Sequence, residues 1–137
     1  MAVRSVGHQA FDQSLTTLRN GLLRLHKTLL DSERYVYERD VRRIGSPWEM
    51  LGLVMNDPWF AWLRQLSGLV VDIDERLAAR EPATRVETEQ FIVRARGLLM
   101  PDEEGSGFER RYFEALQRDP NVVLAHADMM KLLASLS

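Results

Sequence analysis

The sequence predicts an all-α protein built as an up-down helical bundle. Two observations support this prediction. Apolar residues recur at spacings of three and four over long stretches, and helix-start patterns separate those stretches. A chain of 137 residues, 45% of them hydrophobic, can also bury one substantial core. We expect four main helices at about 9–44, 58–80, 85–99 and 120–136, with two short helices at about 47–55 and 108–118.

The first expected helix, 9–44, is the longest, and its apolar residues follow one helix face. That stripe consists of Phe11, Leu15, Leu18, Leu22, Leu25, Leu29 and Val36. At 1.5 Å per residue the helix would be about 50 Å long, more than the roughly 30 Å width of a small domain. We therefore expect it to bend or project, with Gly21 as its weakest point and Gly45 just past its C-terminus. Residues 1–8 are expected to form a flexible lead, and 9–137 a single domain.

The later helices have well-marked starts. Four of the five have a Ser, Thr or Asp as the expected cap, and in three of these four a proline follows: Ser46-Pro47, Asp57-Pro58, Thr84-Arg85 and Asp119-Pro120. Glu49 and Glu87 stand three residues after Ser46 and Thr84, so both pairs predict capping boxes. These starts place the N-termini of four of the later helices, whereas the order of the helices in the bundle stays open.

The later helices also carry apolar stripes. The stripe of 58–80 is Trp59, Trp62, Leu63, Leu66, Leu69, Val70, Ile73 and Leu77. In 85–99, Phe91, Ala95, Leu98 and Leu99 share one side, although the run 91–93 leaves a short strand as the alternative. The inward residues of the last two helices are expected to be Phe108, Tyr112, Leu116, Val122, Val123, Met129, Met130, Leu133 and Leu136.

Composition excludes several classes of function. There is no cysteine, which rules out disulfides, thiolate zinc sites and cysteine nucleophiles. The net charge of −2 shows no basic excess, so we expect no nucleic-acid partner. No stretch is apolar for long enough to span a bilayer, and the N-terminal segment lacks the apolar core of a secretory signal. We therefore expect a cytoplasmic protein without a membrane partner.

The short motifs of common enzyme classes are missing from the sequence. It has no Gly-x-Ser-x-Gly elbow, no phosphate-binding glycine loop and no His-Glu-x-x-His pair. With three histidines in total, a three-histidine metal site is not expected. The prediction is a non-catalytic protein that needs no cofactor, with metal binding kept only as an alternative.

One feature of the first helix does not fit a simple core. At 100° per residue, His26, Glu33 and Asp40 fall within its apolar stripe, and Tyr37 lies one turn after Glu33. In bundle cores, inward carboxylates and imidazoles build ligand or metal sites. The structural alternative is an open bundle end, or a buried polar network closed by a Tyr, Arg or Trp from another helix.

His126 extends this candidate site to the last helix. It falls at the centre of the apolar face, whereas Asp128 lies on the opposite face and cannot share an ion with it. A ligand or metal site would therefore combine His26, Glu33, Tyr37 and His126. The structural interpretation of His126 is a core histidine whose hydrogen bonds are satisfied.

Aromatic residues gather at the corner between the expected helices 47–55 and 58–80. Trp59 and Trp62 align with the apolar stripe, whereas Trp48 and Phe60 stand on first turns, where we expect them near the surface. The cluster is either a plug that closes one end of the bundle or an exposed anchor for a partner, since tryptophan is frequent at interface centres.

These observations lead to one expected function. We expect a non-catalytic bundle that acts through protein contacts, most simply as a homodimer formed through the long first helix, with another protein as a possible partner. The helix is longer than its neighbours can cover, so its second half needs an external cover. The expected interface residues are Tyr35, Val41, Ile44, Trp48 and Phe60. The alternative function is a small-molecule or metal-binding bundle.

Overall fold

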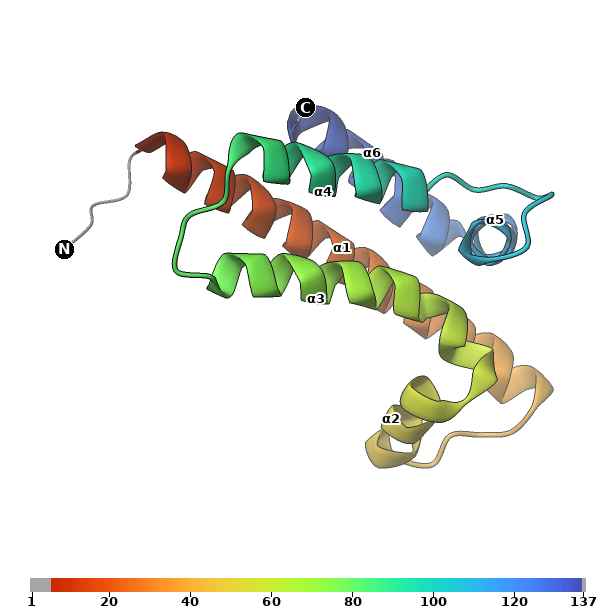
Figure 1. Cartoon of the computed structure of the whole chain (residues 1–137). Helices are drawn as coiled ribbons and strands as arrows, with labels where there is room; N and C mark the ends of the chain where they lie inside the picture. Colours follow the sequence, from red (N-terminus) through yellow and green to blue (C-terminus); the bar gives the residue numbers. More distant parts are fainter. Residues whose placement is uncertain (1–5, 137) are drawn as a thin grey trace.

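A computed structural model describes residues 6–136, and this part of the chain is helical without any strand. The elements are α1 (Val6–Asp40), α2 (Pro47–Asn56), the 3-10 helix η1 (Pro58–Leu63), α3 (Arg64–Ala78), α4 (Arg85–Leu98), α5 (Phe108–Arg118) and α6 (Pro120–Leu136). The four long helices α1, α3, α4 and α6 run in alternating directions, and α5 crosses near one end (Figure 1). The predicted all-α bundle is confirmed, including a helix where a strand was the alternative at 91–93.

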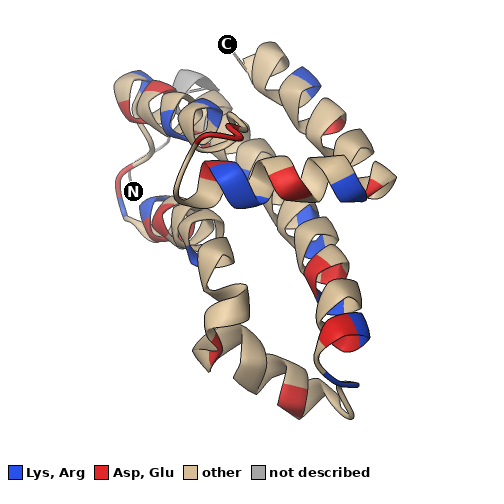
Figure 2. Ribbon diagram, turned by 90° about the vertical axis from the view of Figure 1, so that its right-hand side faces the viewer, with Lys and Arg blue, Asp and Glu red and all other residues tan. Residues whose placement is uncertain are grey.

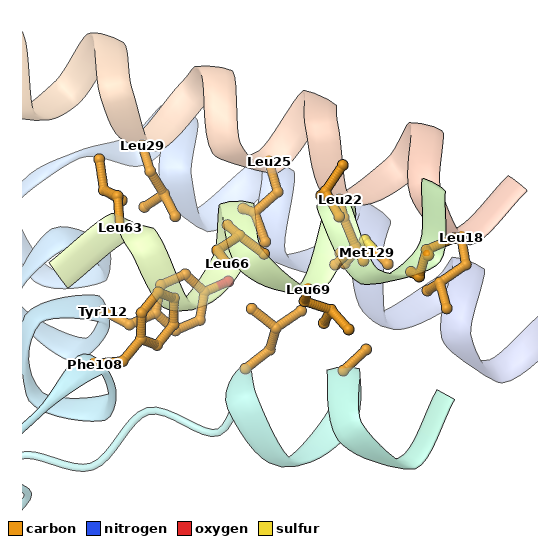
Figure 3. Close-up of a cluster of buried hydrophobic side chains, with 14 of the residues drawn as sticks. Leu18, Leu22, Leu25, Leu29, Leu63, Leu66, Leu69, Phe108, Tyr112 and Met129 are labelled. Carbon is orange, nitrogen blue, oxygen red and sulfur yellow. The ribbon is translucent and has the colours of Figure 1, made fainter. Parts of the chain in front are cut away.

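The core is built around α1, which packs against α3, α4 and α6. Its leucines Leu18, Leu22, Leu25 and Leu29 point toward α3, with α5 and α6 supplying aromatic and methionine side chains (Figure 3). Gly21 lies where α6 crosses α1: a Cβ there would stand 2.7 Å from Cδ1 of Leu132. The glycine thus permits the close approach of these two helices rather than marking a weak point.

Both ends of α1 differ from the prediction. The helix begins at Val6, so the prediction of a flexible lead over 1–8 is wrong for residues 6–8. Residues 1–5 of that predicted lead lie outside the described residues. The helix ends at Asp40 instead of about 44, because the chain leaves the helix to bury Ile44, which is 4% exposed. The backbone N–H of Ile44 donates to Oε2 of Glu38 at 3.1 Å. Gly45 has no positive φ and forms no left-handed cap.

The helix predicted at 58–80 is divided. Its first turns form the 3-10 helix η1, where Asp57 caps by accepting a hydrogen bond from the Trp59 backbone at 2.8 Å. In a 3-10 helix, side chains three residues apart eclipse each other. Phe60 and Leu63 therefore point the same way, and both are buried. The expectation that Phe60 lies near the surface was wrong.

The remaining helices match their predicted ranges within two residues. In two of them, α4 and α6, the residues that are buried differ from those predicted to face inward. The face of α4 that packs inward includes Ile92, which the prediction left out, and Ala95. In α6 Val122 is buried, whereas Val123, predicted inward, is 46% exposed. Of the two expected capping boxes, Thr84 with Glu87 forms fully.

The α4 capping box gives a pH prediction. Arg76 and the Thr84 backbone donate hydrogen bonds to Glu87 and lower its pKa to about 2, from an ordinary 4.5. A carboxylate with a lowered pKa stabilises the fold above its ordinary pKa, and this contribution is lost as the pH falls from about 5 to 2. Since the side chain is 37% exposed, solvent screening leaves about 1–2 kcal/mol.

The variant Glu87→Gln should therefore lose stability at pH 7 but show little of this difference near pH 2. Urea unfolding followed by circular dichroism at several pH values would measure the effect. A variant that tracks the native protein at a constant offset from pH 7 to pH 2 would contradict the assignment. Glu89→Gln, whose 59% exposed side chain pairs with Arg85, is the matched control and should change little.

Candidate functional site

Glu33, the most deeply placed acidic residue of α1, belongs to a buried ion pair. It is 4% exposed, and Nη2 of Arg118, at the end of α5, donates to its Oε1 at 2.6 Å. Nε of the same guanidinium donates to Ser32 Oγ at 3.3 Å. The arrangement matches the structural alternative: a buried polar network that an arginine from another helix closes. The sequence contained no pattern that would have singled out Arg118.

His126 has a different partner. Its Nδ1 lies 2.7 Å from the hydroxyl oxygen of Tyr112, which is fully buried on α5 and stacks on Phe108. Burial raises the pKa of Tyr112 and lowers the pKa of His126, so both are neutral near pH 7. Their hydrogen bond satisfies the buried hydroxyl of Tyr112 and one ring nitrogen of the half-buried His126.

Tyr37 and His26 complete the predicted set. The ring of Tyr37 contacts Trp59 edge-on at 5.5 Å and Phe60 at 5.6 Å, and its side chain interacts with the guanidinium of Arg42. His26 lines a cleft on another part of α1, and burial lowers its pKa. Each of the four predicted site residues thus has its own environment. Among the side chains that the structure describes, no group of three or more His, Asp or Glu residues is placed to hold a metal ion.

The cleft at His26 has a volume of about 260 Å³. Its walls come from α1, α2, η1 and α3: His26, Val54, Met55, Phe60, Leu63, Arg64 and Ser67. Nη2 of Arg64 donates to the backbone carbonyl of Met55 at 2.6 Å and so ties the end of α2 to α3. The cleft is a mainly apolar hollow beside α2.

Next to this cleft, α2 presents an exposed apolar face. None of its residues is buried, although nearly all of them are apolar. Trp48, Leu51 and Met55 are 81%, 48% and 62% exposed, and their spacings of three and four place them on one face. The helix projects from one end of the bundle, away from α4 and α6 (Figure 1). In Figure 2 its ribbon, at the bottom, is almost entirely tan, because Glu49 is its one charged residue.

The five expected interface residues divide into two groups. Tyr35, Val41 and Trp48 are 69%, 52% and 81% exposed and remain candidates for a contact. Ile44 and Phe60 are buried in the chain's own core and cannot serve as surface anchors. The prediction missed Leu51 and Met55, although the apolar composition of 47–55 on all its sides was a usable signal.

Tyr35 lies apart from the face of α2. It lines a groove of about 550 Å³ between α1 and α6, with Asp31, Asp119 and Asp128 among the other lining residues. Acidic and uncharged polar side chains therefore mix with apolar ones along this groove, whereas Trp48, Leu51 and Met55 make the exposed face of α2 uniformly apolar. The α2 face is the more distinct candidate for a functional surface.

The fold and this surface define the class: a small helical bundle with an apolar helix exposed at one end. Comparison with protein-family models, with curated proteins and with solved structures found no match for the chain. Among the described helices, none has the length and apolar character needed to cross a bilayer.

Proposed function

We propose that this protein is a non-catalytic helical bundle that associates with a second copy of itself through the exposed face of α2. The observation that supports the proposal is that α2 is apolar on all sides yet has no buried residue. One side of the helix, with Met50, Leu53 and Val54, packs half-buried against the core, so in a single copy of the chain the other side, with Trp48, Leu51 and Met55, lacks a cover. A homodimer provides that cover without requiring any other component.

The proposal moves the contact from α1, where the sequence placed it, to α2. In the second half of α1, Val36 and Tyr37 are already covered within the chain, and the loop that follows turns Ile44 inward. Val41, 52% exposed in that loop, can add to the edge of the contact. Tryptophan and methionine are also enriched in protein interfaces, while charged residues are depleted at their centres.

A ligand- or metal-binding bundle has less support as an alternative. It needs Glu33 and His126 to face a common space, but Glu33 pairs with Arg118 and His126 with Tyr112. Those two partners, Arg118 and Tyr112, stand six residues apart on α5, about 9 Å along its axis.

The cytoplasmic location of the protein stays a prediction from the sequence.

Sedimentation velocity at micromolar concentration tests the proposed dimer. We expect the native chain to sediment as a dimer and the variants Leu51→Glu and Met55→Glu to sediment as folded monomers, because a carboxylate would be buried in the contact. Val93→Glu is the matched control: Val93 is a 67% exposed residue on α4, and its replacement should leave the dimer intact. A native chain that stays monomeric at high concentration would remove the proposal.

A further inference from the structure

We propose that Trp48 of each copy enters the cleft beside α2 of the other copy. This inference rests on the proposed dimer and names the contact that holds it together. The cleft is the hollow of about 260 Å³ that His26, Phe60 and Leu63 line together with Met55. Trp48 is the most exposed large apolar side chain of the described residues, at 81%.

The spacing of residues on α2 brings the tryptophan and the cleft together. If two α2 helices pack antiparallel about a two-fold axis between Leu51 and Gly52, Trp48 of one copy lies opposite Met55 of the other. Each is the same number of residues from that axis. Because Met55 belongs both to the exposed face and to the cleft wall, the opposing indole lands at the cleft mouth. The contact is then made twice, as a two-fold interface requires.

Gly52 at the axis allows the two helices to approach closely. It lies on the same face as Trp48 and Met55, and a Cβ at this position would meet no heavy atom within 4 Å. The space next to it is therefore open in the single copy. Without a side chain at this point, the backbones can come near enough for the flanking tryptophans to reach across.

The dipoles of the two α2 helices favour the antiparallel arrangement. At the N-terminal end, the positive end of the dipole, the guanidinium of Arg42 pairs with Glu49 of α2. At the C-terminal end, the negative end, Asp57 follows the helix and the guanidinium of Arg64 donates to the carbonyl of Met55, so side-chain charges of both signs stand at each end and the dipole decides the preference. Antiparallel packing sets each positive end beside the partner's negative end, whereas parallel packing would bring like ends together.

The area of the contact also favours an inserted side chain. A helix of 10 residues is about 15 Å long, and two such helices laid side by side fall short of the roughly 800 Å² per partner of a stable interface. A tryptophan seated in a pocket buries about 150–250 Å² in all, which is more than the same side chain buries when it lies flat against a helix. Two reciprocal insertions therefore supply area that the helix faces alone lack.

Two complementary variants test the reciprocal insertion. Trp48→Ala removes the inserted side chain, and Ser67→Trp fills the cleft, since Ser67 lines it and its hydroxyl bonds only to the Arg64 carbonyl of its own helix. Each variant alone should raise the dimer Kd by about 30-fold or more, the effect of a hot-spot residue. Mixed together, the two chains should prefer each other by about 10-fold, because one tryptophan and one open cleft remain.

The mixing experiment uses Trp48→Ala labelled with a dye at its N-terminal amine and titrated with unlabelled Ser67→Trp in fluorescence-detected sedimentation. Circular dichroism checks that both variants fold, and Ser67→Leu replaces Ser67→Trp if the larger residue does not. If the native chain dimerises but the variants dimerise equally well, or show no preference for each other, the insertion is wrong while the dimer stands. A monomeric native chain would overturn both.

Discussion

Replacing Phe60 with alanine is expected to lower the free energy of unfolding by about 3–5 kcal/mol, the usual cost of removing a buried aromatic ring. Phe60 is fully buried in η1 and contacts Tyr37 of α1 with ring centroids 5.6 Å apart. Its loss would leave a cavity where η1 joins the projecting end of α1 to the rest of the bundle. Urea or guanidinium unfolding followed by circular dichroism would measure the change.

Trp48→Ala is the control for this prediction. It removes a larger aromatic residue from the same corner, but Trp48 is 81% exposed, so the folded single copy should lose at most about 0.5 kcal/mol. The measurement belongs at submicromolar concentration, where the proposed dimer contributes least. If both variants lost the same free energy of unfolding, the assignment of Phe60 to the core and Trp48 to the surface would be wrong.

The variant Arg118→Met is expected to destabilise the protein by about 3 kcal/mol, because it leaves the carboxylate of Glu33 buried without a partner. The side chains of the pair are 6% and 29% exposed for Glu33 and Arg118, so solvent replaces little of the lost interaction. The double variant Glu33→Leu with Arg118→Met should recover most of the loss, since an apolar pair of similar size removes the buried charge. Equilibrium unfolding of the single and double variants would show this recovery.

An exposed ion pair provides the comparison. Arg85 and Glu89 lie one turn apart on α4 with side chains 76% and 59% exposed, and Arg85→Met should cost at most about 0.5 kcal/mol. A double variant at Glu33 and Arg118 that is no more stable than Arg118→Met alone would contradict the burial argument. The cost would then lie in packing rather than in the unpaired charge.

Local chemistry made most of the fold predictable. A capping side chain and a proline act on the backbone within a few residues, so the starts at Pro47, Pro58, Arg85 and Pro120 were placed correctly from sequence. The leucine stripe of α1 likewise follows from helix geometry alone, and the structure buries its members. Such features do not depend on which helix packs against which.

Features that depend on tertiary packing were not predictable. The end of α1 is decided by the burial of Ile44, and the 3-10 form of η1 accompanies the burial of Phe60 and Leu63. A helix wheel gives the angular position of a side chain, but not the neighbour that faces it. For this reason Glu33 and His126 were grouped by their positions, while α5 in fact supplies a separate partner to each.

The pairing of α1 with α6 has a consequence for how the protein is made. During synthesis α1 emerges first, but α6 begins at Pro120, 80 residues after α1 ends at Asp40. Until those residues leave the ribosome, the side of α1 around Gly21 that α6 covers stays exposed to water. Contacts between residues so far apart in sequence form late and slow the closing of the fold. A nascent chain stopped before residue 120 would therefore present an uncovered apolar surface, which is the kind of substrate that chaperones and proteases recognise.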